Sequence, residues 1–287
     1  MKVGVILPIS DTDGPHGIPT FGEIVEIARA AEDGGLDSGW IADHYDGLHE
    51  AWTVLSGVAA VTRRIELGPL VACTSFRNAV LTAKMAAALD VVSNGRTILG
   101  LGCGWHEPEF RAMGLPFRDR VSRFEESLEV IVRLLRGERV TLDGPYTTFR
   151  DAILEPPPTR RIPILVAAGR PRMIALTATW ADAWNAAWYG LPNDALRAEF
   201  AGLDAALDAA GRRRDAVEKT VGVEIRDPDQ PPVAEPSEDA FAGDVSGIVE
   251  LLRAYEELGA GHLIVLLEPI SVRSVERLAE ATRRFRS

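Results

Sequence analysis

Histidines follow several apolar segments of this chain, and histidine is the side chain best suited to move a proton near neutral pH. His44 comes directly after Asp43 at the end of one segment, and His106 follows another. His16 and His49 lie in the loops between such segments, where an ordinary exposed histidine is an equally good interpretation. His44 is therefore the strongest candidate among them for a functional role.

A metal centre is one chemistry that these residues could support. The possible ligands are Asp43, His44, Asp46, His106 and Glu107. A metal-dependent barrel hydrolase needs ligands that converge from several strands, yet no His-x-His pair ends the first expected strand and no histidine or carboxylate ends the fifth or sixth. We expect no catalytic metal, and the hydrolase stays as an alternative.

The glycine-rich run Gly100–Gly104 ends another apolar segment. Glycine has no Cβ atom, so a planar ring can lie close to such a backbone. Neither a complete dinucleotide fingerprint nor a Gly-x-Ser-x-Gly or phosphate-loop motif accompanies it. Cys73 and Cys103 have no activating base nearby in the sequence, so we assign neither a nucleophilic role.

A phosphate could bind at Ala168, Gly169 and Arg170, which precede an expected helix over Arg172–Trp180. Small residues at a helix N-terminus leave backbone N–H groups free to bind an anion. The alternative is an ordinary helix start with surface arginines.

Composition excludes several classes of partner. The 287 residues are 46% hydrophobic and carry a formal net charge of −11. Without a basic face, nucleic acid and anionic membranes are improbable partners. No apolar run is long enough to span a bilayer, two cysteines cannot form a disulfide framework, and no signal peptide is recognisable, so we expect a cytoplasmic protein.

The elements that position these residues alternate between strands and helices. Apolar runs typical of buried parallel strands occur at Val3–Pro8, Ser38–Ala42, Ile65–Val71, Thr97–Leu101, Ile162–Ala167, Ala183–Trp188, Thr220–Ile225 and His262–Leu267. Amphipathic helical patterns separate them; in one, Leu81, Met85, Ala88, Leu89 and Val92 share a face. This alternation predicts an α/β fold, a (β/α)₈ TIM barrel, with a doubly wound open sheet as the alternative.

Two segments depart from this alternation. Residues 105–161 form a long excursion between the fourth and fifth strands, with a helix and a hairpin around Asp143-Gly144-Pro145. Residues 227–236 are rich in proline and aspartate and predict an exposed loop. No linker divides the chain, so we expect a single domain over 1–287.

Several motifs resemble the bacterial luciferase-like monooxygenase superfamily, and within it the F420-dependent oxidoreductases. They are Ala42-Asp43-His44, Arg64-Ile65-Glu66-Leu67-Gly68, Lys84-Met85-Ala86, the run 89–96, the run 99–105 and Ala181-Asp182-Ala183-Trp184-Asn185. The resemblance covers nearly the whole chain.

The resemblance implies a TIM barrel that holds a flavin or deazaflavin across its strand ends. It implies a non-proline cis peptide near Leu70-Val71 and a catalytic histidine at His44, which would serve as the proton donor. The implied cofactor-binding residues are Asp43, Leu70, Val71, Cys73, Gly102, Gly104, Ala168, Gly169 and Arg170. The implied substrate pocket comprises His16, Trp105, Glu107 and Trp188.

The implied activity is hydride transfer between F420 and a small organic substrate, in a homodimer. Related sugar-phosphate dehydrogenases carry a glutamate where Trp105 aligns, which disfavours their substrate and suggests a more apolar pocket here, although Glu107 could still reach inward. An FMN-dependent monooxygenase that uses O₂ is the nearest alternative, and a non-catalytic flavin-binding protein is another. A basic track through Arg118, Arg120 and Arg123 would favour the acidic tail of F420.

Overall fold

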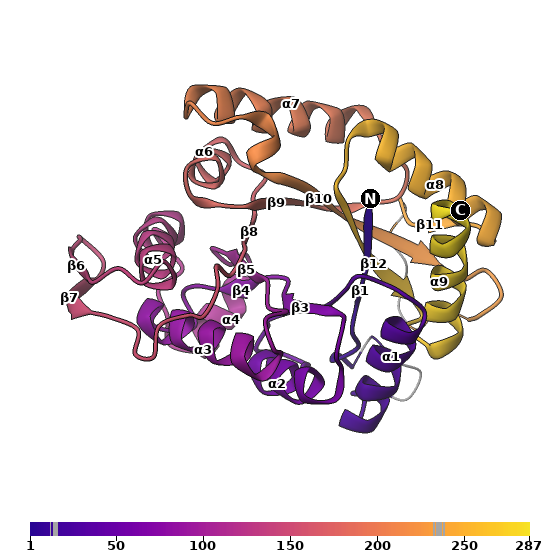
Figure 1. Ribbon diagram of the computed structural model, residues 1–287, viewed down its shortest axis with the longest axis horizontal. Coiled ribbons are helices and arrows are strands. Elements are labelled where there is room, and N and C mark those ends of the chain that lie inside the picture. The colour runs from indigo at the N-terminus through magenta and orange to yellow at the C-terminus, as the bar shows by residue number, and fades with distance from the viewer. Residues whose placement is uncertain (12, 14–16, 232, 234–236, 238) are drawn as a thin grey trace.

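The computed structural model describes residues 1–11, 13, 17–231, 233, 237 and 239–287. Its parallel strands occupy eight positions around the wall of a barrel, which Figure 1 shows. They are β1 (Lys2–Ile6), β2 (Ser38–Ile41), β3 (Glu66–Pro69) continued by β4 (Ala72–Cys73), β5 (Leu99–Gly102), β8 (Ile164–Ala167), β9 (Ala183–Tyr189), β10 (Glu218–Arg226) and β12 (His262–Glu268). The strands pair in parallel in the order β3-β2-β1-β12-β10-β9-β8-β5-β4. All eight predicted strands are present.

The ring of pairings closes between β3 and the residues that enter β5. Leu67 forms a parallel bridge with Thr97, and its N–H donates to the carbonyl of Arg96 at 2.9 Å. The predicted barrel is therefore confirmed, and the open doubly wound sheet is excluded.

The third strand position is broken between β3 and β4, where the Leu70–Val71 peptide bond is cis, as the resemblance implied. Beside the break, a Cβ atom on Gly100 would lie 2.1 Å from the carbonyl oxygen of Pro69, and one on Gly102 would lie 2.6 Å from a Val71 methyl. These two glycines therefore make room for the broken strand. The glycine-rich run by itself predicts room for a ring, whereas the Cβ positions of Gly100 and Gly102 are taken up by the neighbouring strand.

Helices surround the barrel (Figure 1). They are α1 (Phe21–Asp33), α2 (Ala51–Val61), α3 (Ala79–Val92), α5 (Arg120–Leu135), α6 (Pro171–Trp180), α7 (Asp194–Ala209), α8 (Val245–Leu258) and α9 (Val272–Arg286), with a 3-10 turn at Arg214–Ala216. A capping box between Thr20 and Glu23 begins α1, because each satisfies a backbone N–H of the other.

Helix α3 packs a different face against the barrel from the one that its large apolar residues suggest. The buried side contains Ala79, Thr82, Ala83, Ala86, Ala87, Leu89 and Asp90. Leu81, Ala88 and Val92 are exposed and only Leu89 is buried, so most of the predicted apolar face points outward. Small alanines let α3 approach the strands closely, which leaves the larger side chains outside.

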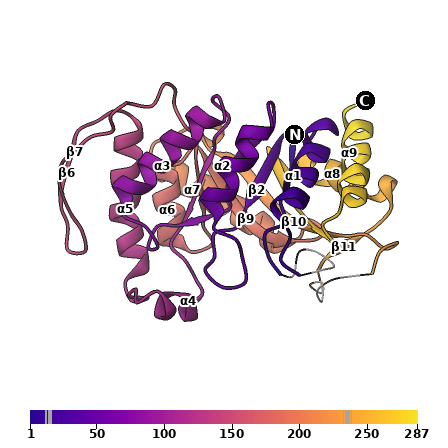
Figure 2. The same cartoon turned by 90° about the horizontal axis from the view of Figure 1, so that it is seen from below.

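The excursion after β5 contains α4 (Glu107–Ala112), α5 and an antiparallel hairpin of β6 (Val140–Asp143) and β7 (Thr148–Ala152). The predicted hairpin is confirmed, and α4 is an additional short helix. The hairpin projects beyond α5, away from the barrel (Figure 2). Residues 232 and 234–236 of the predicted exposed loop lie outside the described part, and β11 (Phe241–Ala242) pairs with β10 beyond it. Asp227, at the start of this segment, is buried and pairs with Arg277, contrary to the prediction.

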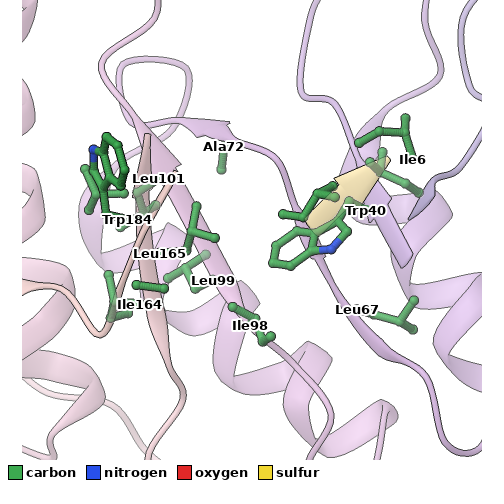
Figure 3. Close-up of a cluster of buried hydrophobic side chains, with 14 of the residues drawn as sticks. Ile6, Trp40, Leu67, Ala72, Ile98, Leu99, Leu101, Ile164, Leu165 and Trp184 are labelled. Carbon is green, nitrogen blue, oxygen red and sulfur yellow. The ribbon is translucent and has the colours of Figure 1, made fainter. Parts of the chain in front are cut away.

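Branched apolar side chains and the tryptophans Trp40, Trp52 and Trp184 fill the core; Figure 3 shows Trp40 and Trp184. Trp184 is fully buried, as its apolar segment predicted, and its Nε1 donates to the carbonyl of Ala168 at 2.7 Å. Trp40 donates to Ser38, whose hydroxyl also contacts the buried His262 at 2.8 Å. His262 begins β12, at the opposite end of the barrel from His44, so it is part of the core.

Candidate functional site

A cavity of about 290 Å³ opens among residues at the carboxyl ends of the strands. It is lined by Ala42, Asp43, His44, Leu70, Val71, Cys73, Phe76, Gly104, Trp105, Glu109, Ala167, Asn185, Ala187 and Trp188. In a parallel barrel, this end is where the βα loops meet and where ligands bind.

The most specific contact in the cavity joins His44, after β2, to Glu109 on α4. The Nδ1 atom of His44 lies 3.0 Å from both carboxylate oxygens of Glu109. The backbone N–H of Tyr45 donates to the same carboxylate at 2.7 Å. Glu109 therefore fixes the orientation of the imidazole and the loop that carries it.

Glu109 is ionised across the neutral range. Its side chain is only 2% exposed, and burial raises the pKa of its carboxyl. The hydrogen bonds from His44 and from the Tyr45 N–H outweigh burial, so the net pKa lies below its ordinary value. Within the described residues, Nε2 of His44 has no hydrogen-bond partner, so that nitrogen is free for a ligand.

Asp43 anchors two loops beneath the cavity. Its carboxylate receives a bidentate pair from Arg77 at 2.7 and 3.0 Å, and a bond from the Cys73 N–H at 3.1 Å. Arg77 also contacts Glu50 at 2.7 Å. The charge of Asp43 is thus compensated, and the residue holds the cavity wall in place.

Small side chains form much of the lining. Ala42, Ala167 and Ala187 come from three different strand ends, and Gly104 joins them after β5. Because alanine and glycine carry little or no side chain, these residues leave space in the cavity beside the Leu70–Val71 step. Larger residues at these four positions would fill that space.

Asn185 supplies a polar group on the same wall. Its Oδ1 accepts a hydrogen bond from Thr220 at 2.7 Å, which orients the amide. The Nδ2 group makes no hydrogen bond to the described residues and is available as a donor to a ligand. The sequence placed Asn185 in a family motif without assigning it to the site.

Two tryptophans border the open side. The indole of Trp105 is 71% exposed and meets the His44 ring edge-on, with centroids 5.8 Å apart. Trp188, at the end of β9, is 42% exposed. Exposed indoles of this size are typical of binding surfaces.

The cavity brings together eight of the predicted site residues. They are Asp43, His44, Leu70, Val71, Cys73, Gly104, Trp105 and Trp188. Burial raises the pKa of the Cys73 thiol to about 12, which makes it a poor nucleophile. Burial also raises the pKa of Cys103.

The other predicted residues lie elsewhere. Gly102 lies behind Val71, and Glu107 is exposed at the first position of α4, two residues before the inward-facing Glu109. Ala168, Gly169 and Arg170 lead into α6 next to Ala167. His16 lies outside the described residues. Glu109, Asn185 and Arg77 were not predicted, since their roles depend on contacts between distant segments.

Two features of the described part of the chain bear on the alternatives. It contains no group of three or more His, Cys, Asp or Glu residues arranged to hold a metal ion. None of its helices combines the length and apolar character needed to cross a membrane.

Comparisons with a family profile and with known proteins agree on one family. The profile of the family described as luciferase-like monooxygenase matches residues 1–226. An F420-dependent glucose-6-phosphate dehydrogenase of Kineococcus radiotolerans is 33% identical, over 71% of this chain and 64% of that protein. A 5,10-methylenetetrahydromethanopterin reductase of Archaeoglobus fulgidus is 34% identical, over 68% of this chain and 57% of that protein. The matched part thus spans less than two thirds of either relative.

Solved structures share the fold. An F420-dependent secondary alcohol dehydrogenase, in complex with an F420-acetone adduct, superposes with a TM-score of 0.82 at 18% identity, over 100% of both chains. The F420-dependent tetrahydromethanopterin reductase of Methanopyrus kandleri gives 0.82 at 21% identity, over 99% of both chains.

Proposed function

The chain belongs to the luciferase-like monooxygenase family, and from this membership we propose that it is an oxidoreductase that uses the deazaflavin F420. The observation that carries the proposal is the His44–Glu109 pair, which stands beside a wall of alanine and glycine at the barrel mouth. The names of the relatives add support, because the F420-dependent enzymes among them match at 33–34% identity.

The small residues fit the cofactor's ring. Ala42, Ala167, Ala187 and Gly104 would line its edges, the Leu70–Val71 step would support one face, and Asn185 would donate to a ring carbonyl. Bound F420 supplies or accepts a hydride. The chain's own contribution is to orient the ring and to exclude water from its face.

His44 would transfer the accompanying proton through Nε2, which has no hydrogen-bond partner among the described residues. Glu109 would keep Nδ1 occupied and so determine which ring nitrogen meets the substrate. The pair resembles the histidine–carboxylate arrangement used by many acid–base catalysts.

The tail of the cofactor would leave toward α6. The residues Ala168, Gly169 and Arg170 precede a helix whose N-terminal N–H groups can bind a phosphate. Arg120 begins α5, and its Nε donates to the carbonyl of Gly104 at 3.1 Å. Arg123 lies over the ring of Tyr146 at 4.8 Å and lines a neighbouring cavity of about 280 Å³. These cations favour an acidic tail.

Fluorescence titration of the purified protein with F420 and with FMN tests the proposal. Tryptophans 105 and 188 border the cavity, so ring binding is expected to quench their emission. Micromolar binding of F420 with much weaker binding of FMN supports hydride transfer. The reverse preference would favour an O₂-using FMN enzyme, and no binding of either would overturn the proposal.

Two copies of the chain would associate through α3. Its outward side carries Leu81, Val91 and Val92, which are large, apolar and exposed. A stripe of this kind on one helix can meet the same stripe of a second copy across a twofold axis.

A further inference from the structure

Trp105 and Trp188 stand at the mouth of the cavity, where they would contact a substrate, whereas the cofactor ring would bind on the cavity floor. Val71 and Cys73 form the deep part, whereas Trp105 and Trp188 stand on the open side. A substrate that approaches a ring on this floor must pass between or beside the indoles. Their chemistry therefore bears on what the substrate is.

The cavity lining carries no lysine or arginine among the described residues. Its acidic groups are already engaged, since Arg77 compensates Asp43 and His44 pairs with Glu109. A phosphate or carboxylate next to His44 would lie near both carboxylates without a cation of its own. Placing an anion there would be costly.

Two further exposed apolar side chains stand close in sequence to the residues of the cavity. Tyr45 follows His44, and Leu191 comes three positions after Trp188.

We infer that the substrate is uncharged at its reacting end, flat and largely apolar, and that Trp105 and Trp188 determine this specificity by packing on its body. The inference rests on the proposed function for the identity of the cofactor. It predicts discrimination between two ligands that differ in a single charge.

Calorimetric titration of the protein saturated with oxidised F420 tests this with 2-acetylnaphthalene and its charged analogue 6-acetyl-2-naphthoate. We expect the neutral ketone to bind at least about tenfold more tightly. Trp105→Ala and Trp188→Ala should each weaken binding of the ketone about three- to tenfold. Trp180→Ala is the control, because Trp180 lies outside the cavity beside Arg136, and it should bind the ketone like the wild type.

A change of preference gives an independent measurement. Trp105→Lys places a cation at the rim, so we expect it to favour the naphthoate over the ketone. Equal or tighter naphthoate binding by the wild type, or no binding of either probe, would overturn the inference.

Failure of the proposed function gives a different pattern, namely no binding of F420. The same pair of probes is then titrated into the protein alone. A preference for the ketone there that depends on Trp105 supports the rim's specificity without the cofactor, and its absence overturns the inference too.

Discussion

His44 and Glu109 are 65 positions apart in the sequence, yet Nδ1 of His44 lies 3.0 Å from both carboxylate oxygens of Glu109. The contact joins the loop after β2 to the short helix α4. It leaves one imidazole nitrogen engaged and the other free, which is the arrangement that a directional proton donor needs.

Replacing His44 by alanine should abolish most turnover and leave the cofactor bound. We expect kcat to fall about 10²- to 10⁴-fold, the usual contribution of a positioned acid or base. Stopped-flow oxidation of reduced F420 measures the rate, and fluorescence titration measures the affinity. Wild-type turnover in this variant would remove His44 from the mechanism.

Glu109→Gln tests whether the carboxylate positions His44. Glutamine keeps the size and one acceptor but loses the charge, so the imidazole is held less firmly. We expect kcat to fall roughly 10²-fold while KM stays near the wild-type value. Glu107→Gln is the matched control, because Glu107 is exposed on the same helix, and it should behave like the wild type. A matching fall in the control, or a change confined to KM, would contradict a positioning role.

Sequence patterns predicted the features that depend on neighbouring residues. They did not predict contacts between segments that are far apart in the sequence. The capping box of Thr20 and Glu23 and the eight strands follow from adjacent residues. Glu107 was placed in the pocket instead of Glu109 because two residues along a helix face nearly opposite ways. Only the start of α4 decides which of them faces His44.

Packing between segments also determines the surroundings of Gly102 and the buried face of α3. The sequence indicated that Gly102 lies against a ligand, yet its missing Cβ accommodates Val71 from the neighbouring strand. Leu81 and Val92 suggested a core-facing stripe, but alanines occupy the core side of α3. Hydrophobicity alone cannot predict which face permits the closer approach of helix and strand.

Gly104→Ala should damage the site more than an equally strained substitution elsewhere. Gly104 has a φ of +76°, and a Cβ there would lie 2.6 Å from the Phe110 ring and 2.8 Å from the Cys73 sulfur. Gly114 has a φ of +69° with no atom within 4 Å of the added Cβ, so it reports backbone strain alone.

We expect Gly114→Ala to cost about 1 kcal/mol of unfolding free energy and Gly104→Ala about 1–3 kcal/mol more. Urea unfolding measures both. Only Gly104→Ala should also weaken F420 binding, and equal effects of the two variants would refute the steric argument.

Stability should decline in acid partly through Glu32. Burial raises the pKa of this carboxyl, but three N–H groups, from residues 63, 64 and 65, donate to its Oε2 and hold the net pKa below the ordinary 4.5. The stabilisation is therefore complete above about pH 4.5. It is lost as the pH falls through the lowered pKa of the folded state.

Glu32→Gln should therefore lower the free energy of unfolding by about 1–3 kcal/mol at pH 7, with a smaller difference from the wild type in stronger acid. Urea titrations across this pH range measure it. Glu26→Gln, at an exposed site on the same helix, should change little. A difference that stays constant down to pH 3 would argue against a lowered pKa.

A charge on the outer face of α3 should separate the proposed dimer into monomers. Val91 is 66% exposed next to Val92, and a twofold axis would bring each such stripe against its copy. Val91→Glu would then place two like charges in an apolar interface, which is unfavourable because each loses water without gaining a partner. Light scattering after size exclusion should give the mass of two chains for the wild type and of one for the variant.

Ile153→Glu alters an exposed apolar residue just after β7 and should stay dimeric. A monomeric wild type, or a Val91→Glu variant that remains a dimer, would mean that the α3 stripe is not the interface.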